Sequence, residues 1–319
     1  MASKNQPNKQ IQSNQKQSKV QKSTKATKTS KGKSLLRETI ITLIYAFVAA
    51  TIIRLYVFET MLVPTPSMVP TINVGDRLFV EKITYSAREP QIGEIVVFYT
   101  PFPDERAQQM LRAFDKFMDM FTPSQFKGSV KYVKRLVGKE GDVLTLQQVD
   151  GNYKLFVNGV IPEHLTSINY ELGGIFKYPK LWEYLVEAST LKSDKEKYRA
   201  YLFTLAQTEG NELANTVFSI LGGLDPVPYG IDYSVVVEKY LKPQNIDISD
   251  YVWTENGQVY IKVPKGFCFF MGDNSVESLD SRYFGFVPKS GIIGRPILRI
   301  WPFADFGPIQ PLLKSVTAQ

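Results

Sequence analysis

Residues 130–137 read VKYVKRLV, an alternation of side chains that is typical of a β-strand. Because side chains two apart in a strand share a face, Lys134 lies on the same, mainly apolar face as Tyr132. Lys131 and Arg135 point to the opposite face. The stretch therefore predicts a strand that places one lysine on an apolar surface.

Other short runs rich in β-branched and aromatic residues lie on both sides of this strand, separated by Gly, Pro and Asn. We expect strands at 77–85, 94–99, 130–137, 143–146 and 155–157, then at 258–263, 267–271 and 294–301. Asn158-Gly159 is predicted to be a hairpin turn, and Asn256-Gly257 a second turn. The two blocks predict a mainly β fold with one sheet-rich domain made of residues 59–161 and 251–319.

Between the two β blocks, residues 162–250 have a mainly helical pattern. Residues 193–196 (SDKE) have the form of a capping box that begins with Ser193, and apolar residues at helical spacing follow. A further helix is predicted over 211–221, before a Gly-Gly pair. We therefore expect an inserted, mainly helical subdomain.

A long apolar stretch precedes the β blocks. Residues 39–58 read TIITLIYAFVAATIIRLYVF, and about 20 residues in a helix match the ~30 Å hydrocarbon core of a bilayer. Its one charge, Arg54, lies near the end and can reach the interface. We predict one transmembrane helix over 35–58. The alternatives are a buried core helix and a cleavable signal peptide, which the small residues at 48–50 favour, although the apolar run continues past them.

The net charge of +7 for the 319 residues is concentrated in one segment. Residues 1–34 contain nine lysines and no acidic residue, and the rest of the chain sums to −2. Such a composition predicts a disordered arm, and the positive-inside rule places it in the cytoplasm with the β-rich domain across the membrane. The basicity therefore does not indicate nucleic-acid binding.

A helix is also predicted over 104–121, where Met and Phe recur at three- and four-residue spacing. Packing of this stripe against the sheet is the commoner arrangement for an amphipathic helix. A stripe that rests in the membrane surface is the alternative. The pattern by itself does not decide between them.

Histidine and cysteine are too scarce for most familiar catalytic or metal sites. The chain has one histidine, His164, and one cysteine, Cys268, which we expect to be a core residue. Ser67 and Lys134 offer a different chemistry: a lysine removed from water has a lowered pKa, and its neutral amine can take a proton from a serine hydroxyl.

The surroundings of Ser67 suit such a role. It lies in residues 64–70 (PTPSMVP), where three prolines predict a stiff, extended segment. Taken singly, however, Ser67 fits an ordinary turn residue, and Lys134 fits an edge-strand lysine that reaches solvent.

A third polar cluster, residues 272–285 (GDNSVESLDSRYFG), follows the predicted strand 267–271. Its hydroxyls and carboxylates can hold a neighbouring amine by hydrogen bonds, and Asp280 and Arg282 can form a charge pair. A solvated loop is the alternative.

Four motifs in a fixed order combine these pieces. They are VPTPSMVPTINVGDRLFVEK over 63–82, IGEIVVF over 92–98, KYVKRLVGKEGD over 131–142 and MGDNSVESLDSRYFGFVP over 271–288. With the preceding anchor, they resemble the type I signal peptidases, membrane-bound serine endopeptidases that remove signal peptides from exported preproteins. The resemblance implies a signal-peptidase-like β-barrel or coiled β-sheet. It does not cover 104–129 or most of 162–250, which look like insertions.

The resemblance also implies roles for single residues. Ser67 would be the nucleophile and Lys134 the general base, while the Thr65 hydroxyl and the Ser67 N–H would stabilise the oxyanion. The residues that would orient the lysine or support its loop are Ser278, Asp280, Arg282, Gly272, Asp273 and Asn274. The residues that would line shallow apolar pockets for small substrate side chains are Met61, Val63, Met68, Ile72, Tyr132 and Val133.

A few positions depart from the family pattern. Pro66 stands where Gly is frequent, which puts the shape of the oxyanion pocket in doubt, and Phe284 replaces a frequent Trp. Val276-Glu277 differs from the common polar residues. His164 matches no family role.

The resemblance implies no metal, cofactor or nucleic acid. The expected partners are signal peptides of exported preproteins and the lipid bilayer, with a functional link to the protein export translocon. The expected location is the bacterial cytoplasmic (inner) membrane, crossed once. A self-cleaving repressor of the SOS type shares the Ser/Lys chemistry, but not the anchor. The sequence is also compatible with a membrane-anchored peptide-binding β protein or an inactive peptidase relative.

Overall fold

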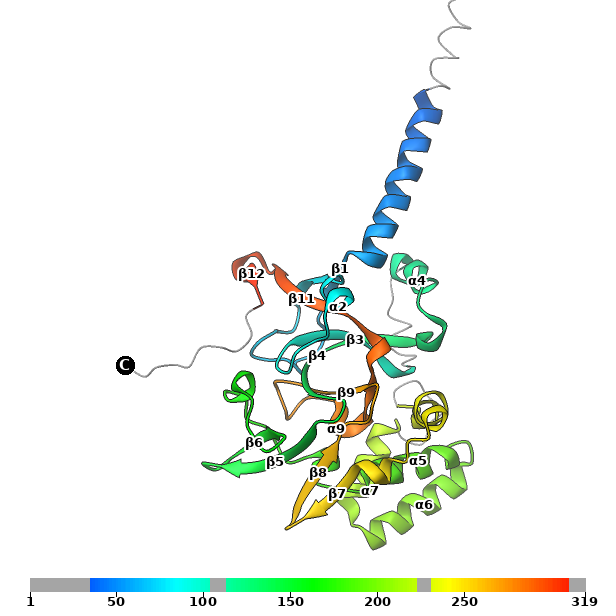
Figure 1. Ribbon diagram of the computed structural model, residues 1–319. Coiled ribbons are helices and arrows are strands. Elements are labelled where there is room, and N and C mark those ends of the chain that lie inside the picture. Colours follow the sequence, from blue (N-terminus) through cyan, green and yellow to red (C-terminus); the bar gives the residue numbers. More distant parts are fainter. Residues whose placement is uncertain (1–34, 104–112, 223–230, 310–319) are drawn as a thin grey trace, which may run out of the picture. The chain divides into compact units, whose positions relative to one another are not determined.

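The computed structural model describes residues 35–103, 113–222 and 231–309 (Figure 1). Contacts divide the chain into two compact units, one up to Arg54 and one from Leu55 onward. The first described element is the helix Leu35–Tyr56, which by length and composition is able to cross a membrane. Phe58, the last residue of the predicted span, instead begins the first strand. The Lys-rich arm lies outside the described residues.

An antiparallel sheet of eight strands forms the frame of the second unit, with the order β1-β2-β11-β3-β4-β9-β10 and β12 paired to β11 (Figure 1). Its strands are β1 (Phe58–Leu62), β2 (Arg77–Glu81), β3 (Ile95–Pro103), β4 (Ser129–Lys139), β9 (Phe267–Met271), β10 (Val287–Pro288), β11 (Ile292–Trp301) and β12 (Gly307–Pro308). The mainly β fold is confirmed. Because β4 lies between β3 and β9, the strand that carries Lys134 is an interior strand and not an edge.

A second antiparallel sheet has the order β6-β5-β8-β7. Its strands are β5 (Val143–Val149), β6 (Asn152–Val157), β7 (Val252–Glu255) and β8 (Gln258–Lys262). Asn256 and Gly257 form the turn between β7 and β8, with the positive φ angles that tight hairpins need. The hairpin turn predicted at Asn158-Gly159 is confirmed, since both residues have positive φ and the turn closes with one antiparallel bridge between Val157 and Val160. The hairpin that joins β5 and β6 turns at Asp150-Gly151.

The predicted strand over 77–85 ends early, at Glu81. The Glu81 carboxylate accepts the backbone N–H groups of Ile83 and Thr84, each at 2.9 Å, and so starts the short helix α2 (Thr84–Ala87). This side-chain cap competes with continued strand pairing. Strands β1, β7, β10 and β12 were not predicted.

Helices occupy much of the segment between the two β blocks. They are α5 (Leu181–Leu191), α6 (Lys195–Thr208), α7 (Asn211–Ile220) and α8 (Tyr233–Val236), the last continued by a π-helical turn (Val237–Leu241). The start of α6 corrects the predicted capping box, because Asp194 and not Ser193 is the N-cap and accepts the Lys197 N–H at 3.2 Å.

The remaining helical elements are short. They are α4 (Ala113–Asp119), α9 (Ser281–Phe284) and 3₁₀ turns at Ser124–Phe126, Glu163–Leu165, Gly174–Phe176, Lys242–Gln244, Ile248–Tyr251, Lys289–Gly291 and Phe303–Asp305. The first half of the helix predicted over 104–121 thus lies outside the described residues, and the second half contains α4. At its described end, Met120 and Phe121 are exposed rather than packed in the core.

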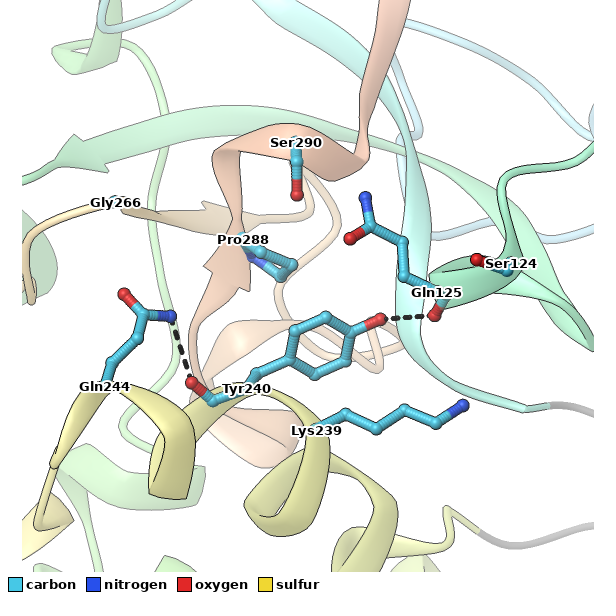
Figure 2. Close-up of a pocket in the computed structure, with 8 residues that line it drawn as sticks. All are labelled: Ser124, Gln125, Lys239, Tyr240, Gln244, Gly266, Pro288 and Ser290. Carbon is cyan, nitrogen blue, oxygen red and sulfur yellow. Dashed lines mark hydrogen bonds between the residues drawn. The ribbon is translucent and has the colours of Figure 1, made fainter.

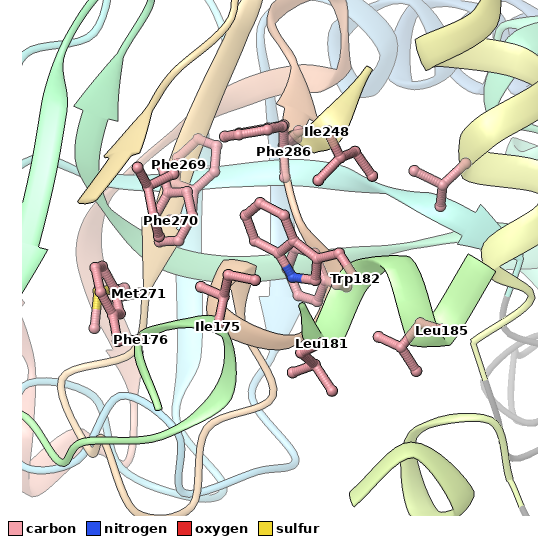
Figure 3. Close-up of a cluster of buried hydrophobic side chains, with 14 of the residues drawn as sticks. Ile175, Phe176, Leu181, Trp182, Leu185, Ile248, Phe269, Phe270, Met271 and Phe286 are labelled. Atoms are coloured by element: carbon pink, nitrogen blue, oxygen red, sulfur yellow. The ribbon is translucent and has the colours of Figure 1, made fainter. Parts of the chain in front are cut away.

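The main hydrophobic core joins the large sheet to the helices. Figure 3 shows Phe269 of β9 and Phe286 around Trp182 of α5, with the Trp182 and Phe286 rings 5.0 Å apart. A second, smaller cluster contains Val133 of β4, whereas Leu136 of the same strand belongs to the main core. Both faces of β4 are therefore covered by apolar side chains around its middle, which removes Lys134 and Arg135 from water.

Candidate active site

Ser67 lies in the loop between β1 and β2. The loop is closed at its base by hydrogen bonds from Val63 N–H to Asp76 O and from Gly75 N–H to Val63 O. The predicted extended conformation is wrong: the segment folds into turns, in which Ile72 N–H donates to Met68 O at 2.9 Å. These local bonds form because the prolines restrict φ but leave the other backbone donors available. The Ser67 side chain is thereby held in a buried position.

Lys134 reaches Ser67 from the middle of β4. Its Nζ lies 2.5 Å from the Ser67 Oγ, and both residues are only 4% exposed. Burial lowers the pKa of the Lys134 ammonium from 10.5 to about 8, although Asp280 and Asp273 act in the opposite direction. The amine at this contact therefore exchanges its proton near neutral pH.

The loop that follows β9 holds the backbone of the serine. The Asn274 N–H donates to the Ser67 carbonyl at 3.1 Å, and its Nδ2 donates to the Pro66 carbonyl at 3.2 Å. The Pro66 carbonyl and the Ser67 N–H belong to one planar peptide unit. Asn274 therefore orients the peptide unit whose N–H belongs to Ser67.

A buried ion pair connects this loop to β4 and to the serine loop. Arg135 donates to Asp273 through Nε at 2.7 Å and through Nη2 at 2.6 Å, and the Thr71 hydroxyl donates to the same carboxylate at 2.6 Å. Such two-point contacts fix both orientation and distance. Sequence reasoning missed the roles of Arg135 and Thr71, since alternation placed Arg135 on the opposite face from Lys134 but identified no partner for it.

Asp280 and Arg282 form the pair expected from the sequence. Arg282 Nε and Nη2 each donate to the Asp280 carboxylate at 2.9 Å, and both side chains are fully buried. Asp280 also accepts the Gly272 N–H at 3.0 Å. The pair therefore ties the two ends of the loop together beneath the serine and lysine.

Thr65 and Ser278 lie close to Ser67, but with different contacts. The Thr65 hydroxyl is 3.4 Å from the Ser67 Oγ. The Ser278 Oγ is buried and has no hydrogen-bond partner among the described residues, so the expected bond to Lys134 is not formed. A Cβ on Gly272 would lie 2.3 Å from the Ser278 Oγ and 2.4 Å from the Ser67 carbonyl oxygen. Only glycine fits between these two serines.

Five of the six residues predicted to line substrate pockets lie together. Those five are Met61, Val63, Met68, Ile72 and Val133, four of them buried in the smaller apolar cluster and Met61 packed against it. Tyr132 lies on the opposite face of β4, where its ring is 6.5 Å from that of Phe98 and 5.3 Å from the Lys134 Nζ. The structure therefore places Tyr132 beside the lysine and not in the predicted pocket.

A cavity of about 500 Å³ is separate from these residues (Figure 2). Tyr240 crosses it, with its hydroxyl donating to the Gln125 carbonyl at 2.8 Å. None of the residues predicted from the sequence to act in catalysis lines it. Cys268 is buried, which raises the pKa of its thiol to about 12.

A family model described as "Signal peptidase, peptidase S26" matches residues 36–301. The chain belongs to this family. The match includes all four motifs, so the family prediction made from them is confirmed.

Individual relatives are similar at modest identity. The signal peptidase I of Buchnera aphidicola (subsp. Acyrthosiphon pisum) is 27% identical over 86% of this chain and 78% of the relative. That of Aquifex aeolicus is 28% identical over 82% of each chain. A crystal structure of a signal peptidase I from Enterococcus faecalis aligns with 65% of this chain and 97% of that chain at 18% identity, with a TM-score of 0.24, too low to support a structural comparison.

One further polar group near the family motifs was not found from the sequence. Glu59 of β1 is buried and accepts hydrogen bonds from Lys82 at 2.9 Å and from Lys131 at 2.7 Å. Although burial acts to raise the pKa of the Glu59 carboxyl, the two lysines lower it below its ordinary value. Glu59 thus connects β1 with Lys82, which follows β2, and with Lys131 of β4. Alternation along β4 predicts only that Lys131 and Lys134 lie on opposite faces, and it does not identify Glu59 as the partner of Lys131.

Proposed function

We propose that this signal peptidase cleaves preproteins with Ser67 as the nucleophile and Lys134 as the general base. The observation that carries the proposal is the contact of 2.5 Å between the Lys134 Nζ and the Ser67 Oγ inside a site that burial keeps dry. A neutral amine at that distance accepts the hydroxyl proton as the oxygen attacks.

The chemistry then follows two steps. The Ser67 Oγ attacks the carbonyl carbon of the scissile bond, its proton passes to the Lys134 Nζ, and the Ser67 N–H and Thr65 hydroxyl stabilise the oxyanion. Each such donor contributes about 3–4 kcal/mol. When the intermediate collapses, the mature chain leaves as an amine that takes the proton from Lys134. Lys134, neutral again, then takes a proton from water, which hydrolyses the ester, returns the proton to the Ser67 Oγ and releases the signal peptide.

The membrane arrangement is part of the same proposal. The helix Leu35–Tyr56 anchors the chain in a bacterial cytoplasmic membrane, with the nine lysines of residues 1–34 on the cytoplasmic side. The peptidase unit then works on the far side, where preproteins emerge from the export translocon. Residues 162–250 form an inserted helical subdomain in that unit.

The test uses the purified full-length chain in detergent and a preprotein with an Ala-x-Ala cleavage site. We expect Ser67→Ala and Lys134→Met each to abolish cleavage. Ser290→Ala and Lys262→Met are matched controls, because both side chains are exposed and neither belongs to the four family motifs. Full activity in either dyad variant would refute the assignment. Binding of the preprotein without cleavage by the unmodified chain would favour a peptide-binding protein instead.

A further inference from the structure

The loop between β1 and β2, which carries Ser67, is held by an arginine of β11. The Arg299 Nη2 donates to the Thr71 carbonyl at 2.9 Å, and the Arg299 Nε forms an ion pair with the Asp76 carboxylate at 2.8 Å. The Asp76 side chain is 2% exposed and that of Arg299 is 18% exposed, so the contact is largely shielded from water. One guanidinium therefore holds the loop at two points, beyond the nucleophile and at the base.

The pairing of strands directs Arg299 toward this loop. In the antiparallel ladder of β11 and β2, Arg299 lies opposite Leu78, and side chains directly opposite each other share a face of the sheet. Leu78 is buried in the smaller apolar cluster, which also contains Met68 and Ile72 of the serine loop. The register shifts between Arg299 and Trp301, and such bulges change the direction of side chains next to functional sites. Arg299 thus lies on the face that the serine loop covers.

Thr71 is the point at which the support from β11 meets the support from the lysine strand. The Thr71 hydroxyl donates to Asp273 at 2.6 Å, and Asp273 accepts two hydrogen bonds from Arg135. Arg135 is the neighbour of Lys134 on β4. The Thr71 carbonyl, by contrast, accepts its bond from Arg299. Two arginines on different strands therefore fix the position of one residue in the serine loop.

A single turn connects Thr71 to the nucleophile. The Thr71 carbonyl and the Ile72 N–H belong to one planar peptide unit. That N–H donates to the carbonyl of Met68 at 2.9 Å, and Met68 directly follows Ser67. Arg299 therefore binds one side of the peptide unit whose other side holds the residue next to the nucleophile.

We propose that Arg299 is a positioning residue that sets the place of the Ser67 hydroxyl against the Lys134 amine. The inference rests on the proposed function, because it concerns the same reaction. Nucleophile and base come from a loop and a strand, and a misplacement of about 1 Å between reacting groups can lower a rate by about a hundredfold. A lysine in place of Arg299 keeps a charge for Asp76 but lacks the rigid, planar set of donors that also reaches the Thr71 carbonyl.

The test uses the purified full-length chain in detergent and the preprotein with an Ala-x-Ala site. Arg299→Met removes both contacts, whereas Arg299→Lys keeps the positive charge beside Asp76. Arg295→Met is the matched control, because Arg295 lies on the same strand and forms ion pairs with Glu81 and Glu94, neither of which belongs to the serine loop. Tryptophan fluorescence in urea gives the folded fraction of each protein, so that kcat is expressed per folded molecule.

We expect kcat per folded molecule to fall by about tenfold in both Arg299 variants and to stay within about twofold of the wild type in Arg295→Met. A merely structural role would lower stability and leave kcat of the folded fraction unchanged. If Arg299→Met fails to fold, Arg299→Lys decides the outcome.

An unchanged kcat in folded Arg299→Lys, whether or not KM changes, overturns the proposal, and so does an equal loss of kcat in Arg295→Met. Failure of the wild type to cleave the preprotein instead overturns the proposed function, so the two failures are distinguishable.

Discussion

Replacement of Lys134 by methionine should make the protein more stable at neutral pH while abolishing catalysis. The ammonium has a pKa of about 8 in the folded protein, against 10.5 for an ordinary lysine. That difference corresponds to a cost of about 3 kcal/mol to the folded state at pH 7. Methionine has a similar length and no charge, and its introduction loses one hydrogen bond to Ser67, worth about 1 kcal/mol. We therefore expect Lys134→Met to raise the free energy of unfolding by about 2 kcal/mol.

The gain should depend on pH in a defined direction. Below pH 8 the lysine is protonated in both states and the full cost is present. Between pH 8 and 10.5 the unfolded chain binds more protons than the folded chain, so the stability of the wild type rises by about 1.4 kcal/mol per pH unit. Near pH 10.5 the cost is gone, and Lys134→Met should be no more stable than the wild type.

Unfolding in urea can be followed on the full-length chain in detergent by tryptophan fluorescence, because Trp182 is fully buried and becomes exposed on unfolding. At pH 7 the expected gain corresponds to a rise in Tm of about 4–8 °C. Lys262→Met, at an exposed position on β8, controls for the loss of a lysine as such. A variant that is less stable than the wild type at pH 7, or a difference that does not shrink toward pH 10.5, would refute the reasoning.

Two other outcomes follow from the same site. Since only neutral Lys134 accepts the Ser67 proton, kcat/KM should rise about tenfold per pH unit up to about pH 8 and level off above it; a flat profile from pH 6 to 9, measured with saturating detergent and constant salt, would contradict this. Asp280→Asn leaves the buried Arg282 without its carboxylate, so urea titration should show a loss of about 3–5 kcal/mol. Because the Asp280 carboxylate raises the pKa of Lys134, the rise of kcat/KM with pH should occur at lower pH in folded Asp280→Asn protein than in the wild type. An unchanged pH dependence of kcat/KM would argue against this effect of Asp280 on Lys134.

Local patterns predicted much of the β framework. The run over 267–271 forms β9 with those bounds, and 130–137 forms the middle of β4. Alternation also placed Lys134 and Tyr132 on one face, as found. Predictions failed where a side chain competed with the backbone, as at Glu81, or where hydrogen bonds within a loop overrode its prolines, as around Ser67.

Within the candidate site, contacts between residues close in sequence could be predicted, whereas contacts between distant segments could not. Asp280 and Arg282 are close in sequence, and their pairing could be anticipated from the loop alone. The pairing of Arg135 with Asp273 could not, because strand periodicity assigns a side chain to a face without specifying what covers that face. The contact of Asn274 with the Ser67 peptide likewise depends on how β9 aligns with the loop after β1.

By itself, the sequence determined that a hydroxyl, a lysine and a polar loop occur in the order of a signal peptidase behind an apolar helix. These are properties of local pattern and composition. Only the tertiary structure decided that β4 is interior, which is why Lys134 loses water and has a lowered pKa. It also decided that Arg299 of β11 reaches the loop of Ser67, because contacts between distant segments depend on the whole fold and not on any one stretch of the chain.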